Sequence, residues 1–264
     1  PFPPDLRGLI AELAPQGNLL DAKFDWTGEL PDRASFTARS RFSGLTMNAW
    51  RTVPGFANIS GSVTASEARG SVTFASRKSE IDLPKVFPER RIALDELSGE
   101  VAWERLAAAG PGKLPGVGLR LSSLRFANED MAGMVHGSYA WGDEGPGRAD
   151  LTLQLSRADG KTTAKYLPLA GIMGERTREW GAGALLAGQL SDARMRLKGD
   201  LNDFPFVDAS KGQFDVTAKL LDAVFDYATG WPRMEQLEAT LLLDRDRFDL
   251  VGHKGSILGA MVEN

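Results

Sequence analysis

The chain has 264 residues, of which 42% are hydrophobic and 25% are charged, a balance typical of a folded globular protein rather than a disordered or membrane-embedded one. It has no cysteine and two histidines, His136 and His253, which excludes disulfides, thiolate zinc sites and cysteine nucleophiles and leaves little for a histidine-based metal site or triad. The net charge of -4 at pH 7 gives no electrostatic reason to bind nucleic acid, and we expect no nucleic-acid partner.

The ends of the chain indicate a segment of a longer polypeptide. The sequence begins at Pro1 without an initiator Met and stops beside a strand-like run. No window approaches the roughly 20 apolar residues of a membrane-spanning helix. The sequence also has no basic segment followed by an apolar stretch of the kind found in signal peptides.

The first predicted elements are a short helix over Asp5 to Leu13 and a strand over Asp21 to Trp26, in which Ala22, Phe24 and Trp26 share one face. The same period-two alternation of apolar and polar side chains recurs along most of the chain. It is found over residues 71–75, 119–126, 135–141, 151–156, 194–201, 213–219, 237–244 and 248–251. Each run predicts a strand with one apolar face.

Turn residues such as Pro54-Gly55 and Asp159-Gly160 separate these strands, and almost no interval holds a crossover helix. We therefore predict a mainly β protein with minor α content, built as a large curled antiparallel sheet that forms an open apolar gutter. A β-sandwich or a closed barrel would show the same alternation, so periodicity does not separate the three architectures.

One segment, near residues 162–190, breaks the alternation. Apolar residues such as Tyr166, Leu169, Met173 and Trp180 recur there at helical steps, and four glycines in it predict two short helices rather than one long one. We expect this segment to cover one end of the sheet, with a lid as the alternative. The predicted organisation is one β-rich segment over 1–264, with a sheet over 1–160, a helical insertion over 161–190 and a sheet over 191–264.

Motifs for catalysis or cofactor binding are absent from the sequence. Gly160-Lys161-Thr162 resembles the end of a phosphate-binding loop, but Leu155 stands where the first glycine is required. The acidic pairs Glu129-Asp130 and Asp143-Glu144 lack regular ligand spacing and are interpreted as solvated turns. We predict no catalytic residue, no metal site, no cofactor and no enzymatic activity.

Short sequence motifs, in order along essentially the whole chain, resemble the central region of the YhdP-like proteins of the bacterial AsmA-like family. The motifs include 54–61 (PGFANISG), 81–84 (IDLP), 97–103 (LSGEVAW), 166–168 (YLP), 199–206 (GDLNDFPF), 212–214 (GQF) and 227–232 (YATGWP). One departure is Gly181, where the family pattern has Leu after the tryptophan.

The resemblance implies a protein of the Gram-negative periplasm, anchored in the inner membrane through a helix outside this segment. Such proteins are bridge-like lipid transporters that carry phospholipid between the inner and outer membranes and support the outer-membrane permeability barrier. Expected partners are phospholipid acyl chains, the rest of its own longer chain, and inner- and outer-membrane proteins. The alternative is a non-catalytic structural or interaction module of the cell envelope.

The candidate lipid-binding residues are the apolar residues that alternate with polar residues along the predicted strands. The expected groove lining comprises Phe24, Trp26, Val72, Phe74, Leu119, Leu121, Leu151, Leu153, Leu155, Met195, Leu197, Leu201, Phe214, Val216, Leu237, Leu241 and Leu243. The competing interpretation of these residues is an ordinary closed β core. Phe204-Pro205-Phe206 is expected to anchor the chain where it returns to the sheet, because the residue before a proline favours extended geometry.

Overall fold

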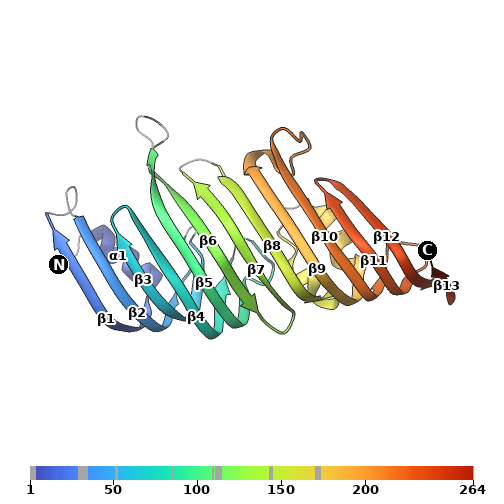
Figure 1. Ribbon diagram of the computed structural model, residues 1–264, viewed down its shortest axis with the longest axis horizontal. Helices are drawn as coiled ribbons and strands as arrows, with labels where there is room; N and C mark the ends of the chain where they lie inside the picture. The colour runs from blue at the N-terminus through green and yellow to red at the C-terminus, as the bar shows by residue number, and fades with distance from the viewer. Residues whose placement is uncertain are drawn as a thin grey trace. The chain divides into compact units, whose positions relative to one another are not determined.

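The computed structural model describes residues 4–28, 35–50, 53–84, 86–108, 110, 115–142, 145–169 and 174–263 (Figure 1). Its helical elements are α1 (Pro4–Leu13), the 3-10 helices η1 (Gly160–Tyr166) and η2 (Leu201–Asp203), and α2 (Glu175–Ala184). Its strands are β1 (Gln16–Thr27), β2 (Ser35–Met47), β3 (Gly55–Ser66), β4 (Arg69–Asp82), β5 (Arg91–Ala108), β6 (Pro115–Ala127), β7 (Met131–Trp141), β8 (Arg148–Asp159), β9 (Leu185–Asp200), β10 (Gly212–Phe225), β11 (Met234–Asp244), β12 (Arg247–Ile257) and β13 (Ala260–Glu263).

The strands pair in simple chain order. Hydrogen bonds join neighbours from β1 to β13 in one thirteen-stranded antiparallel sheet. Within the described residues, β1 and β13 are the two ends of this order and do not pair with each other. The prediction of an open antiparallel sheet is confirmed, and the sandwich and barrel alternatives are wrong.

The chain divides into two compact units. The first contains residues 1–84, 90–128 and 136–145, and therefore α1 and β1 to β6. The second contains residues 85–89, 129–135 and 146–264, and therefore β8 to β13 with η1, α2 and η2. Strand β7 contributes residues to both.

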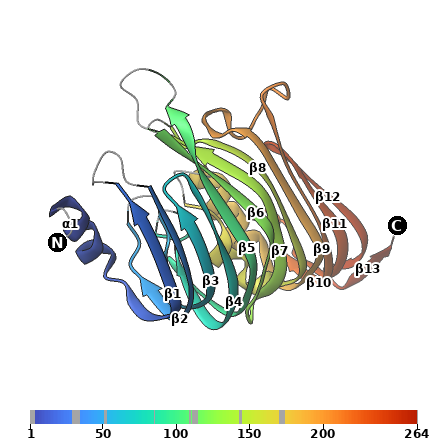
Figure 2. The ribbon, with the colours of Figure 1, turned by 60° about the vertical axis from the view of Figure 1, so that its left-hand side comes forward.

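Bulges interrupt the strands of both units. Asn58 in β3, Ser123 in β6, Asp192 in β9 and Asp222 in β10 have φ values of 54°, 47°, 51° and 47°, in the left-handed region that Asn and Asp tolerate better than most residues. The pairing register shifts beside several of them, for example between Leu220 and Ala223. A bulge bends its strand, and the strands in Figure 2 are bent along their length.

Each bulge keeps the apolar side chains on one face by lengthening one step of the alternation. In β10 the buried Leu220 is followed by buried Ala223 three positions later, while Leu221 and Asp222 between them are exposed. In β3, the same three-residue step separates Phe56 from Ile59, and both belong to one apolar cluster. The apolar face therefore continues past the bend.

The core of the first unit is one apolar cluster that extends to both sides of the bulges in β2 and β3. Phe42, Ile59, Leu94 and Leu97 are its buried members, and further apolar side chains of β2 to β6 pack around them. We call the face of the sheet that carries this cluster the apolar face of the first unit, and the opposite one its polar face.

We call the face of the second unit that carries the buried Leu220, Ala223 and Phe225 its apolar face, and the opposite one its polar face. The helical segment covers part of this apolar face. Trp180 of α2 makes edge-to-face contacts with Phe248 and Phe225, with ring centroids 4.9 and 6.2 Å apart, and α2 lies behind the strands in Figure 1. Ala184 at the end of α2 joins the same buried cluster as Leu220. The prediction of two short helices near 162–190 is confirmed, although β9 already begins at Leu185.

Candidate functional site

The apolar face of the second unit carries a row of side chains that crosses five strands. Leu153, Met195, Val216, Leu243 and Phe248 stand directly opposite one another on β8 to β12. Strands are spaced about 4.8 Å apart, so the row extends for about 19 Å. All five side chains are partly exposed, and the first four do not pack against the buried cluster, whereas Phe248 does. We call these five residues the apolar strip.

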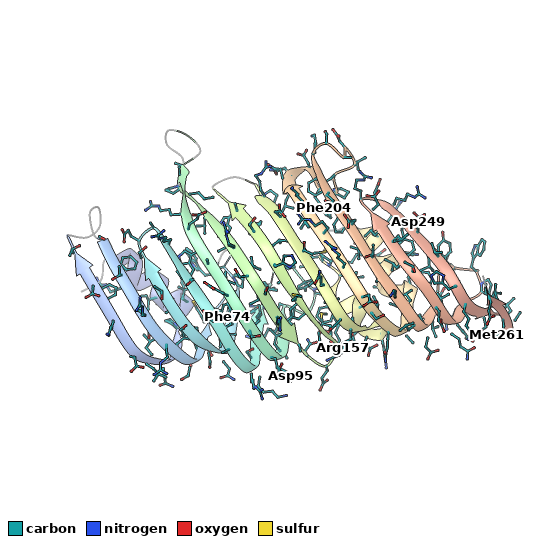
Figure 3. The ribbon with its side chains drawn as sticks, in the orientation of Figure 1. Phe74, Asp95, Arg157, Phe204, Asp249 and Met261 are labelled. Atoms are coloured by element: carbon teal, nitrogen blue, oxygen red, sulfur yellow. The ribbon has the colours of Figure 1, made fainter. Side chains whose placement is uncertain are left out.

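Aromatic side chains close both ends of this face. Beyond one end, Trp180 and Ala184 of α2 pack onto the sheet. Beyond the other, Phe206 is 0% exposed, and Phe204 contacts Phe214 with ring centroids 4.9 Å apart. Figure 3 shows Phe204 at the end of the unit where β9 and β10 are connected. Helix α2 therefore reaches the strip at Phe248, and Phe206 covers the neighbouring ends of β9 and β10.

Glycines make room for Phe206. A Cβ added to Gly199 or Gly212 would approach the Phe206 ring to 2.6 or 2.5 Å, so the ring lies directly on these two residues of β9 and β10. The Phe206 backbone has a φ of 66°, which is costly for a bulky residue and is held in place by this packing. The predicted anchoring role of residues 204–206 agrees with this arrangement.

The apolar face of the first unit is more open toward β1. Val63, Val72, Val101 and Leu121 form a cross-strand row over β3 to β6, and all are partly exposed. At the edge, Phe24 is 61% exposed and stacks on Phe36. Aromatic side chains this exposed are unusual for a closed core.

The predicted lining residues fall into four groups. Thirteen are partly exposed residues within strands, namely Val72, Phe74, Leu119, Leu121, Leu151, Leu153, Leu155, Met195, Leu197, Phe214, Val216, Leu241 and Leu243. Phe24 and Trp26 are exposed at 61% and 47%, whereas Leu237, at 4%, belongs to the buried cluster beneath α2. Leu201 lies in η2, directly after the end of β9, and not within a strand.

Sequence reasoning missed apolar residues that lie beyond the bulges. Leu220, Ala223 and Phe225 of β10 are buried and pack with α2, but they were not predicted to lie on the apolar face. The signal was present as a three-residue step between Leu220 and Ala223, which a strict two-residue alternation does not recognise. Residues that tolerate a left-handed backbone conformation, such as Asp222, mark where such a step occurs.

Charged side chains occupy the opposite face of the second unit and pair with one another. Arg196 bonds to Asp150 and to the Leu151 carbonyl, and Lys219 Nζ lies 2.7 Å from Asp192 Oδ2. These residues alternate with Leu197, Leu151 and Ala218 of the apolar face. The structure therefore places the apolar residues on one face of the sheet and the charged residues on the other, as the alternation predicts.

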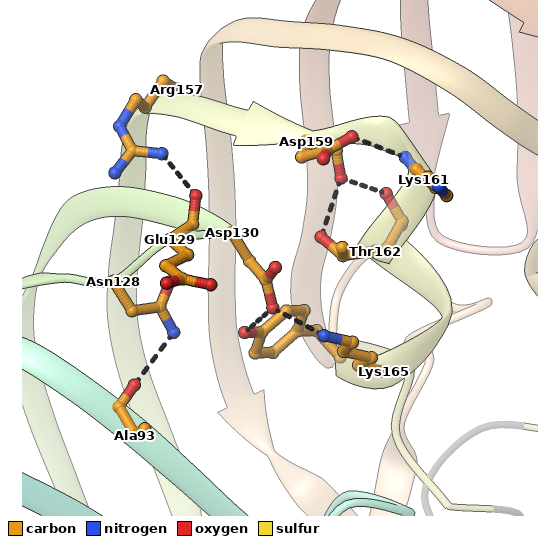
Figure 4. A network of polar contacts seen from close by, with 11 residues as sticks. Ala93, Asn128, Glu129, Asp130, Arg157, Asp159, Lys161, Thr162 and Lys165 are labelled. Atoms are coloured by element: carbon orange, nitrogen blue, oxygen red, sulfur yellow. Dashed lines mark hydrogen bonds and ion pairs between the residues drawn. The ribbon is translucent and has the colours of Figure 1, made fainter.

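Asp130 fastens η1 to the second unit (Figure 4). The Tyr166 hydroxyl donates to Asp130 Oδ2 at 2.7 Å, and Lys165 Nζ lies 3.2 Å from the same oxygen. Burial opposes ionisation of this carboxyl, but the hydrogen bonds from Tyr166 and Lys165 outweigh it and hold the pKa of Asp130 below its usual value. Asp130 is thus a structural anchor rather than the solvated turn residue that the sequence predicted. Asp143 and Glu144 lie outside the described residues.

We expect the contribution of Asp130 to stability to disappear in acid. Because its folded pKa is depressed, the contribution is complete above the unfolded value of about 3.9 and is lost as the pH falls through the lower folded pKa. At pH 7, Asp130→Asn should lower the free energy of unfolding by about 1 to 3 kcal/mol. Denaturant titrations of both proteins between pH 7 and 3 should show this gap closing below about pH 4.

Glu129→Gln is the matched control for that titration. Its side chain is exposed, and Arg157 Nη1 donates to the Glu129 backbone carbonyl, which the substitution keeps. We expect a change within about 0.5 kcal/mol at every pH. A gap between Asp130→Asn and the unsubstituted protein that persists unchanged at pH 3 would contradict the assigned role.

The described residues contain no group of three or more His, Asp or Glu side chains arranged to hold a metal ion. His253 Nε2 lies 2.9 Å from the Thr240 hydroxyl at the exposed surface of β11 and β12. No helix in the described part of the chain is long and apolar enough to cross a membrane.

The structure therefore places the chain in the class of proteins built on an open antiparallel sheet whose apolar face is partly exposed. The chain belongs to the YhdP protein family, which matches it over residues 1–264. It is 22% identical, over 271 aligned positions, to the intermembrane phospholipid transporter YhdP of Escherichia coli strain K12. That alignment covers 98% of this chain and 20% of the relative, so the chain spans a fifth of the relative's length. No solved structure matches the chain significantly.

Proposed function

We propose that this chain is a segment of an intermembrane phospholipid transporter whose apolar sheet face holds acyl chains. The observation that carries the proposal is the apolar strip, an apolar row of about 19 Å whose side chains are all partly exposed and of which only Phe248 packs against the buried cluster. Membership of the YhdP family and the name of the Escherichia coli relative support the same cargo.

The energetics suit passive movement. Each acyl methylene removed from water contributes about 0.8 kcal/mol, so contact with part of a chain retains a lipid. The strip consists of Leu, Met, Val and Phe side chains, and no charged residue interrupts it. A uniform apolar surface allows a chain to slide without meeting a deep trap. The transport step needs no catalytic residue and no cofactor.

The setting proposed for the protein is the bacterial periplasm, with an inner-membrane anchor outside this segment and with support of the outer-membrane barrier as its role. Inner- and outer-membrane proteins are further proposed partners. The rest of its own chain is another, because all twelve residues of β1 are exposed at the edge of the first unit. An exposed edge strand presents unpaired N–H and C=O groups that another strand can join.

A purely structural module of the envelope is the competing function, and site-specific photocrosslinking separates the two. Photoreactive residues at Phe74, Leu153, Leu197 and Leu241 should capture phospholipid in Gram-negative cells, because these side chains stand on the apolar faces. Lys198 and Thr217 are the controls, since both are exposed on the polar face of the second unit. Thr152 shares their parity but is 6% exposed, which makes it a weaker control.

We expect lipid adducts at the four apolar positions and background levels at the two controls. Equal adducts on both faces, or none at any position, would exclude the acyl-chain role and favour the structural module.

A further inference from the structure

The polar face of the first unit is hollowed by a groove of about 940 Å³. Its lining includes Lys23, Arg39, Arg69, Arg120 and Glu104, together with small side chains of β3 to β5. The volume lies near the upper end of the range for small-molecule sites. Of the residues predicted to contact acyl chains, Leu119 alone also lines this groove.

Strand register assigns the groove to the polar face. Lys23, Arg39, Thr64, Ser71, Ala102 and Arg120 stand directly opposite one another in a single row across β1 to β6. Phe24 and Val72, which alternate with this row, do not line the groove, whereas the apolar residues Trp103, Leu106, Leu119 and Tyr139 do. The lining therefore combines small polar residues and long cationic residues of the polar face with a few large apolar side chains.

The cations of the groove do not form the ion pairs that other cations of the polar face form. Outside the groove, Arg41 pairs with Asp21, and Arg77 Nη2 lies 3.6 Å from Glu96 Oε1. Within the described residues, the side chains of Lys23, Arg39, Arg69 and Arg120 form no ion pair and no hydrogen bond, although Arg69 stands opposite Glu104 in register.

The balance of charge in the groove is positive. Four cationic and two anionic lining side chains, the latter Asp25 and Glu104, leave a net charge of +2. The whole chain, by contrast, has a net charge of -4. A cationic groove on an acidic protein, with no internal partners, is suited to an anionic ligand.

We propose that this groove binds a soluble phosphorylated sugar. Arg39 and Arg120 approach from opposite sides, four strand spacings or about 19 Å apart at the backbone, and guanidinium groups bind phosphate through paired, charge-assisted hydrogen bonds. Between them, the hydroxyls of Thr64 and Ser71 can hydrogen-bond to sugar hydroxyls. The acyl chains of a lipid held on the apolar face lie on the other side of the sheet.

Calorimetric titration of the intact protein with fructose 1,6-bisphosphate tests the proposal. We expect saturable binding that Arg39→Gln and Arg120→Gln each weaken by about tenfold or more, because each removes a charge-assisted contact. Arg77→Gln is the matched control, since Arg77 lies on the same face but already pairs with Glu96. It should bind like the unsubstituted protein. Circular dichroism melting should show that all three variants are folded.

Further arms of the experiment identify the source of the phosphate. Fructose alone should not bind, and inorganic pyrophosphate should bind more weakly than the sugar bisphosphate. Binding confined to phosphatidylglycerol vesicles would overturn the proposal in favour of a membrane surface. Pyrophosphate binding as tight as that of the bisphosphate, no saturable binding at millimolar bisphosphate, or equal affinity in Arg39→Gln and Arg120→Gln would also overturn it.

Discussion

Met195→Asp is expected to slow lipid transport strongly while leaving the protein folded. Met195 is the second residue of the apolar strip, between Leu153 and Val216, and its side chain is partly exposed. An unpaired carboxylate pressed against an acyl chain costs several kcal/mol. Because about 1.4 kcal/mol corresponds to a factor of ten in rate, transport should fall at least about tenfold. The measurement is outer-membrane permeability in cells that depend on the protein, together with lipid photocrosslinking from Leu197.

Two variants accompany this test. Thr217→Asp places the same charge on the polar face, opposite Arg194, and should transport normally. Met195→Leu keeps the strip apolar and should also be active, because swaps that conserve volume are tolerated. Normal transport by Met195→Asp, at unchanged protein levels, would argue against passage of lipid over the strip.

Phe206→Ala is expected to lower the free energy of unfolding of the second unit by about 3 to 5 kcal/mol. The Phe206 side chain is fully buried on Gly199 and Gly212 and contacts Phe204, with ring centroids 5.9 Å apart. Alanine would leave a cavity between the chain return and the sheet. It would also keep the left-handed backbone of this position without the packing that holds it. Denaturant unfolding measures the change.

Val207→Ala is the neighbouring control. Val207 is 69% exposed, so its truncation should change stability by less than about 0.5 kcal/mol. If the two variants unfold at the same denaturant concentration, Phe206 does not anchor the return of the chain to the sheet.

Much of the secondary structure follows from local pattern. The alternation at Leu151, Leu153 and Leu155, or at Leu237, Ala239 and Leu241, predicts a strand because successive side chains of a strand point to opposite faces. The helical steps around Trp180 predict α2 for the corresponding reason. The alternation predicts that the strand continues to Leu201, but this residue lies in η2. The Asp200 side chain accepts a hydrogen bond from the Asn202 backbone N–H there, and the chain turns.

The polar residues were harder to place. Asp130 is assigned to a solvated turn by composition alone, but it receives hydrogen bonds from Tyr166 and Lys165, thirty-six and thirty-five positions away. The row of cations on Lys23, Arg39 and Arg120 is likewise invisible along the chain, because strand pairing brings together residues that are distant in sequence.

The sequence by itself determined that this protein is a one-sided antiparallel sheet without disulfides or clustered histidines, because side-chain alternation and composition are local properties. Only the tertiary structure decided which apolar residues are buried and which stay open. Leu237 and Leu243 share a parity in β11, but Leu237 is buried beneath α2, whereas Leu243 remains partly exposed in the apolar strip. Their difference depends on which segment packs above each of them, and alternation along a strand carries no information about that.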